Sequence, residues 1–90
     1  MIKNSEFIQT CLHHLQSLRV GEKISFKTAK KDREIAVSKK EGGGYRVEEN
    51  GFEHQIFEAQ SEAELKKILK TLQKIEFPRS NQIWVKIERG

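Results

Sequence analysis

The chain has 90 residues, with a hydrophobic fraction of 36%, a charged fraction of 33% and a formal net charge of +4. These values predict one folded domain over residues 1–90 and exclude a disordered chain, while a single cysteine excludes a disulfide scaffold. No apolar run is long enough for a transmembrane helix, and the polar N-terminal stretch lacks the apolar centre of a signal peptide. We therefore expect a cytoplasmic protein that does not act at a membrane.

The first predicted element is a helix that starts near Asn4 or Ser5, either of which can cap it, and stops at Gly21. Its apolar residues recur at three- and four-residue spacing, which defines one buried stripe. The stripe consists of Phe7, Ile8, Cys11, Leu12, Leu15 and Leu18.

Two short half-buried strands are predicted next, because apolar residues alternate with polar ones at Ile24 and Phe26 and again at Ile35 and Val37. The polar segment 30–32 is expected to connect them.

A hairpin is predicted around Asn50-Gly51, since both residue types tolerate the positive φ of a two-residue type I′ turn. That turn would pair Glu49 with Phe52, Val47 with His54 and Tyr45 with Ile56, leaving Tyr45, Val47, Phe52 and Ile56 on one apolar face. The three glycines 42–44 fall at the other end of the hairpin, where they are expected to connect two strands. A phosphate loop is not favoured, because it would need a helix to begin directly after the glycines.

A second helix is predicted to begin at Ser61, where Ser61 and Glu64 form a capping box, and to end at Pro78. Its expected buried stripe is Leu65, Ile68, Leu69, Leu72 and Ile75.

A final strand is expected at Ile83, Val85 and Ile87, with Trp84 on the opposite face. The predicted fold is α+β in the order α-β-β-β-β-α-β, a mainly antiparallel sheet of four or five strands with both helices on one face. The position of the last strand stays open, because a helical crossover can set it parallel to the fourth strand.

Charge is distributed in blocks, since residues 19–46 hold nine basic and four acidic side chains whereas residues 47–65 hold six glutamates and no lysine or arginine. Basic side chains bind nucleic acid by displacing counterions from phosphates, and a neighbouring aromatic ring can stack on a base. We therefore expect a non-enzymatic module that binds the phosphate backbone of RNA or DNA through a basic strand-and-loop cluster. The cluster is Lys27, Lys30, Lys31, Arg33, Lys39, Lys40, Tyr45 and Arg46.

Several alternatives stay open for these charges. Individual lysines can simply be solvated or protect exposed strands from aggregation, and Tyr45 can belong to the core. A second basic row, at Lys66, Lys67, Lys70 and Lys74, is either the wet face of a helix or a phosphate-binding ridge if it lies beside the cluster.

The rival function is a protein-interaction module or homo-oligomer that uses Trp84 and the acidic segment 48–64. Alternatively, Phe57 or lysine stems cover Trp84. We expect no catalytic site, cofactor or metal: Cys11 falls within an apolar stripe, and Cys11, His14 and His54 lack the spacing of metal ligands.

Overall fold

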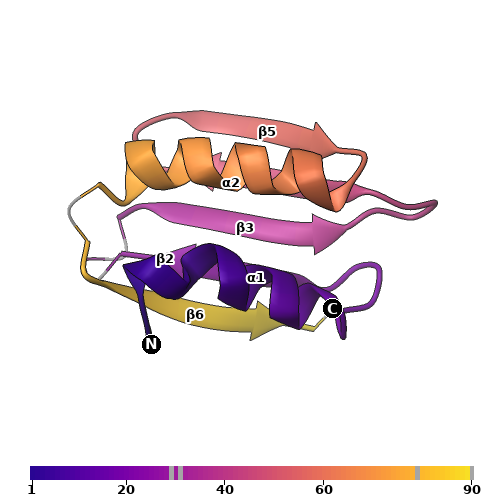
Figure 1. The fold of residues 1–90 in the computed structure, drawn as a ribbon, viewed down its shortest axis with the longest axis horizontal. Coiled ribbons are helices and arrows are strands. Elements are labelled where there is room, and N and C mark those ends of the chain that lie inside the picture. Colours follow the sequence, from indigo (N-terminus) through magenta and orange to yellow (C-terminus); the bar gives the residue numbers. More distant parts are fainter. Residues whose placement is uncertain (29, 31, 79, 90) are drawn as a thin grey trace.

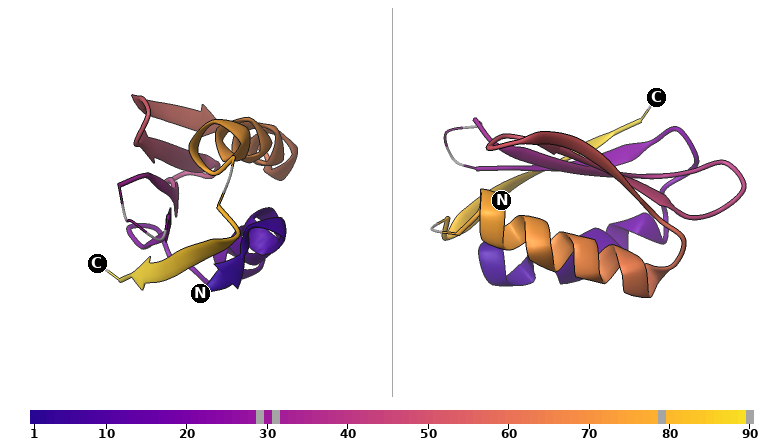
Figure 2. Two further views of the ribbon diagram at one scale, coloured as in Figure 1. Left: turned by 90° about the vertical axis from the view of Figure 1, so that its left-hand side faces the viewer. Right: turned by 90° about the horizontal axis from the view of Figure 1, so that it is seen from above.

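The protein is described here by a computed structural model that covers residues 1–28, 30, 32–78 and 80–89. Within these residues a six-stranded antiparallel sheet forms one layer and two α-helices form the other (Figures 1 and 2). The elements in chain order are β1 (Ile2–Lys3), a 3₁₀ turn η1 (Asn4–Glu6), α1 (Phe7–Leu15), β2 (Lys23–Lys27), β3 (Glu34–Lys39), β4 (Tyr45–Asn50), β5 (His54–Ala59), α2 (Glu62–Glu76) and β6 (Gln82–Glu88).

The predicted fold class and element order are confirmed, with the addition of the two-residue strand β1. The strands lie in the order β1-β6-β2-β3-β4-β5, and both helices pack on the same face of the sheet, as the right-hand view of Figure 2 shows. The chain crosses through α2 from β5 at one edge to β6 near the other, where β6 lies between β1 and β2 and is antiparallel to both. The helical crossover thus sets β6 in the same direction as β5, the fourth predicted strand, but the two are not neighbours in the sheet.

The core lies between the sheet and the helices. Phe7 of α1 makes edge-to-face contacts with Phe26 of β2 and with Phe77, at ring-centroid distances of 4.7 and 5.5 Å. Fully buried aliphatic side chains from the strands and from α2 surround these rings: Ile24, Ile35, Val37, Val47, Leu65, Leu69 and Ile83. The first helix is shorter than predicted, because α1 ends at Leu15 and Leu18 is buried from the connection that follows.

The predicted register of the β4–β5 hairpin is wrong. The strands pair Asn50 with His54, Val47 with Phe57 and Tyr45 with Ala59, so that residues 51–53 form a three-residue connection in place of the two-residue turn. A shift by an odd number of residues exchanges the two faces of a strand. Phe57 and Ala59 therefore point toward the core, whereas Phe52 and Ile56 are 71% and 51% exposed.

The second helix begins as predicted, because Ser61 is the N-cap and its Oγ accepts a hydrogen bond from the Glu64 N–H at 3.2 Å. The Glu64 carboxylate accepts from the Gln60 N–H at 3.1 Å, one residue before the position that a capping box predicts. The predicted stripe is wrong at its last position, where Ile75 is 39% exposed and Glu76 is buried. Positions 65, 69, 72 and 76 follow the three- and four-residue spacing that faces the core, and Glu76 ends that row.

Candidate functional site

One face of the sheet carries the helices, and among the described elements no helix covers the other, which we call the open face. Strand residues alternate between the two faces, and Phe26 and Ile83 belong to the core. The residues of β2 and β6 that alternate with these core positions therefore point to the open face. On β2 and β6 these neighbours are Lys23, Ser25, Lys27, Trp84, Lys86 and Glu88.

A basic strip, defined as Lys23, Lys27, Lys86 and the ring of Trp84, runs along these two strands. The register places Lys27 directly opposite Trp84 and Lys86 opposite Ser25. Directly opposed residues lie on the same face with their Cβ atoms about 5 Å apart. Trp84 is 41% exposed, so an aromatic surface lies beside Lys27 and Lys86, with Lys23 further along β2.

Two lysines of the basic strip take part in solvent-accessible ion pairs. Lys23 Nζ lies 3.4 Å from Glu88 Oε2, and Lys27 Nζ lies 3.7 Å from Glu34 Oε2. Exposed pairs of this kind contribute at most about 1 kcal/mol. Neither ion pair therefore holds its lysine strongly.

The strip leads into a shallow corner cleft of about 560 Å³ at the β3–β4 end of the sheet. Ser38 lies between Lys23 and Arg46 in the register, so these two basic side chains flank its hydroxyl on the open face. The cleft is lined by Gly21, Lys23, Ser38, Lys39, Lys40, Glu41, Arg46 and Glu48. Four basic and two acidic side chains give it a positive balance that suits an anion.

Lys40 forms an ion pair with Glu58 of β5 at the margin of this cleft. The pKa of the Glu58 carboxyl is lowered, chiefly by the hydrogen bond that Lys40 donates and by the charge of Lys40. The charge of Arg46 lowers it further. The carboxylate thus stays ionised and competes with other anions for Lys40.

The structure divides the predicted cluster into two groups. Lys27, Lys30 and Arg33 lie around the β2–β3 connection, whereas Lys39, Lys40 and Arg46 lie at the opposite end of β3. A six-residue strand separates its ends by roughly 17–20 Å. Lys31 lies outside the described residues, and Tyr45 points to the helix-covered face, where it packs against the core.

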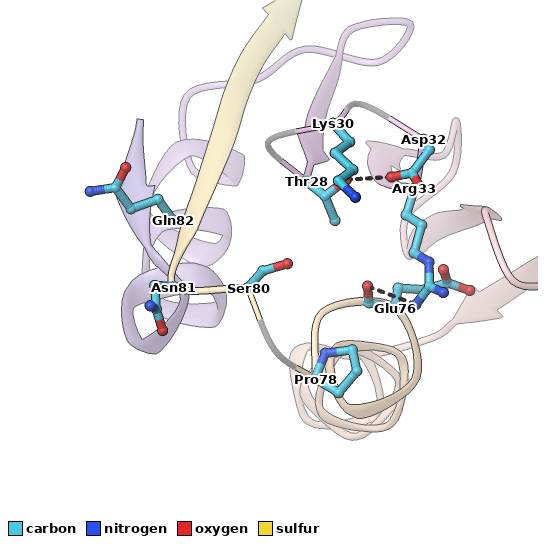
Figure 3. Close-up of a pocket in the computed structure, with 9 residues that line it drawn as sticks. All are labelled: Thr28, Lys30, Asp32, Arg33, Glu76, Pro78, Ser80, Asn81 and Gln82. Atoms are coloured by element: carbon cyan, nitrogen blue, oxygen red, sulfur yellow. Dashed lines mark hydrogen bonds between the residues drawn. The ribbon is translucent and has the colours of Figure 1, made fainter.

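The β2–β3 end forms a second cleft, of about 950 Å³, against the end of α2 and the segment before β6 (Figure 3). Arg33 Nη1 donates to the carbonyl oxygens of Ile75 and Glu76 at 3.4 and 3.5 Å, which places its charge at the negative end of the helix dipole. Thr28 Oγ1 donates to Asp32 Oδ1 at 2.8 Å and lowers the pKa of that carboxyl. Both signs of charge line this cleft, so it has no clear preference for an anion.

A pair of carboxyl groups is buried beside the second cleft. Glu49 of β4 and Glu76 of α2 are each 1% exposed, and the Glu76 carboxylate accepts hydrogen bonds from the Phe52 N–H at 3.0 and 3.1 Å. The pKa of Glu49 is raised to about 7, chiefly by burial. The hydrogen bond with Glu76, the charge of Glu76 and the charge of Glu53 raise it further. The sequence gives no signal for this pair, because its members are 27 positions apart.

The lysine row of α2 does not join the basic strip. Lys66, Lys67, Lys70 and Lys74 are exposed on the helix layer, and the core and the sheet separate them from the open face. The lysine row of α2 and the basic strip therefore form separate surfaces.

Cys11 is fully buried within the core, as its position in the apolar stripe predicts. Burial raises the pKa of its thiol to about 12, which keeps it protonated and unreactive at neutral pH. Among the described residues no three histidine, cysteine or acidic side chains are grouped to hold a metal, and no helix has the length and apolar character needed to cross a membrane.

Comparison of the chain with protein-family models, curated proteins and solved structures finds no match in any of the three. Function is therefore argued from the site itself. Sequence reasoning missed Lys23 and Lys86 as members of the site. Strand alternation holds the signal for Lys86, which stands two residues from Trp84 and so shares its face.

Proposed function

We propose that the protein is a non-enzymatic module that binds single-stranded nucleic acid on its open face. The observation that carries the proposal is the basic strip, in which Lys27 and Lys86 lie beside the partly exposed ring of Trp84 and Lys23 continues the row of charges along β2. Lysines supply phosphate contacts, and an aromatic ring on a sheet supplies a stacking surface for an unpaired base. Bases in a duplex are already stacked, which favours the single-stranded form.

The corner cleft extends this surface for the backbone of the same strand. Lys23 belongs to both, and Arg46 lies across Ser38 from it. A single nucleic-acid strand that stacks one base on Trp84 can continue along β2 toward Arg46, Lys39 and Lys40. Lys23 and Lys27 are four positions apart, which corresponds to roughly 13 Å along β2.

Trp84 is the single tryptophan of the chain, so its fluorescence reports directly on this site. Titration with a single-stranded oligonucleotide is expected to quench this emission, and the association constant should fall steeply as salt rises. A variant with Lys23, Lys27 and Lys86 all replaced by glutamine should bind more weakly. Its slope of log K against log salt should be smaller by about 2, at roughly 0.7 for each lost phosphate contact.

The matched control replaces Lys66, Lys67 and Lys70 of α2 by glutamine, which removes the same charge from the other side of the molecule. This variant should retain the quenching and the greater part of the affinity. Equal loss in both variants would show that net charge alone drives binding. An unmodified protein whose emission does not respond at low salt would refute the proposed function.

A further inference from the structure

The edge strand β5 has features of an interface. It is the last strand of the sheet, and within the described residues it pairs only with β4. Exposed edges usually carry lysine, proline or a bulge that prevents a further strand from pairing. The sequence of β5, "HQIFEA", contains neither lysine nor proline and presents the exposed Ile56 at its centre.

The opposite edge of the sheet is protected from pairing with a further strand, whereas the β5 edge is not. There the terminal strand β1 is only two residues long, and β6 behind it carries the exposed Lys86. The contrast makes β5 the edge that is suited to pairing.

The side chains of β5 are complementary to those of a second β5 in antiparallel orientation. With Ile56 opposite Ile56 of the other copy, His54 of each copy faces Glu58 of the other on the open-face side. The imidazole N–H can then donate to the carboxylate, and two apolar side chains meet at the centre. A register centred on Phe57 instead sets Ile56 against Glu58, and one centred on Gln55 sets His54 against Ile56.

The helix-covered side of the same edge offers apolar surface. A groove of about 230 Å³ is lined by Phe57, Ile68, Leu72, Thr71 and Lys67. It lies on the flank of α2 that faces away from α1, since Gln73 on the other flank donates to Asn4. In the register centred on Ile56, the two Phe57 rings are diagonal neighbours and within reach of each other beside this groove.

From these features we infer that the protein forms a symmetric dimer through antiparallel pairing of β5 with β5 of a second copy, with the two-fold axis at Ile56. The dimer joins the two sheets into one, with both open faces on the same side. β3 and β4 separate β5 from the basic strip, so dimer formation leaves the strip accessible. The inference goes beyond the proposed function and does not depend on it.

The first test is molar mass as a function of protein concentration, measured by sedimentation equilibrium. The unmodified protein should pass from monomer to dimer, and Ile56→Lys should remain monomeric because two ammonium groups would meet at the axis. Val20→Lys is the matched control, since Val20 is 56% exposed and precedes β2. It should dimerise like the unmodified protein. A protein that stays monomeric at every concentration, or an Ile56→Lys variant that still dimerises, would overturn the inference.

The second test fixes the register by charge exchange. His54→Glu and Glu58→Lys should each weaken dimerisation about tenfold, because the first sets two carboxylates opposite one another and the second removes the acceptor of the His54 N–H, each at two symmetric positions. Combined in one chain, the two substitutions set a carboxylate at position 54 against an ammonium group at position 58 of the other copy and should restore most of the affinity. Failure of the double variant to recover would rule out this register.

Cross-linking gives an independent test of the axis. Residues directly opposite in an antiparallel pair have Cα atoms about 4.5–5.5 Å apart, within the range that a disulfide spans. Mild oxidation should therefore link Ile56→Cys to its copy, whereas Glu58→Cys should stay reduced because the two copies of residue 58 are offset by roughly 13 Å along the strands. The buried thiol of Cys11 does not interfere. Cross-linking at 58 without cross-linking at 56 would overturn the inference.

Discussion

The connections before and after β4 both contain glycine, and they differ in backbone conformation and in surroundings. Between β3 and β4, Gly42, Gly43 and Gly44 have φ angles of +86°, +105° and +84°. A Cβ atom at Gly42 or Gly43 would meet nothing within 4 Å. These glycines are required by the path of the backbone, and the prediction that they connect two strands is confirmed.

The connection between β4 and β5 shows the reverse. Gly51 does not have a positive φ, but a Cβ atom there would lie 2.2 Å from Glu76 Oε1 and 3.1 Å from Arg33 Cβ. The lack of a side chain allows the buried Glu76 carboxylate to approach the turn and accept from the Phe52 N–H. Glycine is thus used for backbone freedom in one connection and for close packing in the other.

The largest expected effect is that of Gly51→Ala, because the added methyl group must displace a buried carboxylate and its hydrogen bonds. We expect the free energy of unfolding to fall by about 2–3 kcal/mol, as overpacking and an unsatisfied polar group together predict. Urea unfolding measures the loss. Phe52→Ala, at the exposed neighbouring side chain, should change stability by less than about 0.5 kcal/mol. A Gly51→Ala variant as stable as the control would disprove the close contact.

A smaller effect is expected from the carboxyl pair that fills the space beside Gly51. The pKa of Glu49 is about 7 in the folded protein, against an ordinary value of 4.5. The Glu49 carboxyl therefore binds its proton more tightly in the folded state than in the unfolded state. The stability gained from this tighter binding is fully present below pH 4.5. This stability is lost as pH rises toward 7.

The loss for the unmodified protein between pH 5 and pH 7 should be of order 1–2 kcal/mol. Glu49→Gln retains an amide donor for Glu76 and cannot ionise, so its stability should vary much less over the same range. Thermal unfolding across this pH range measures the difference, with Glu41→Gln at an exposed position as the control. A slope that survives in Glu49→Gln would assign it to another group.

Gly43→Ala should cost no more than this, because the methyl group has space and only the backbone is strained. A residue with a side chain at φ of +105° is disfavoured by about 1–2 kcal/mol. Asparagine tolerates positive φ better than alanine, so Gly43→Asn should recover part of the loss in the same urea measurement. If alanine and asparagine cost the same, backbone strain is not the cause.

Local patterns were sufficient for most of the fold. Alternation around Phe26, Val37 and Val85 located three strands, and Ser61 located the start of α2. The hairpin register was not accessible in this way, because the type I′ prediction from Asn50-Gly51 used local preference alone. A contact of Glu76 with a turn 24 positions earlier accompanies the wider connection that replaced it.

The candidate site was harder to predict than the fold, since it depends on which strands become neighbours. Lys39, Lys40 and Arg46 were identified, and the structure groups them in the corner cleft. Lys23 joins them only because β2 pairs with β3, and Lys86 reaches the strip only because β6 pairs with β2. Grouping basic residues by their distance in the sequence combined two ends of β3 that lie apart in space.

The smallest expected effect is that of Gly43→Ala on nucleic-acid binding, which separates a role of the glycines from a role of the charges around them. Replacing Lys39, Lys40 and Arg46 with glutamine should weaken binding. It should also lower the slope of log K against log salt by about 0.7 for each lost phosphate contact. Gly43→Ala leaves these charges in place and should bind single strands nearly as well as the unmodified protein. Salt titrations of a labelled oligonucleotide against both variants compare them directly. A phosphate-cradling loop predicts the opposite order, because a side chain at Gly43 would block the approach of the anion to the backbone. Loss of binding in the alanine variant with binding retained in the glutamine variant would therefore transfer the anion site from the side chains of the corner cleft to the backbone of the glycine turn.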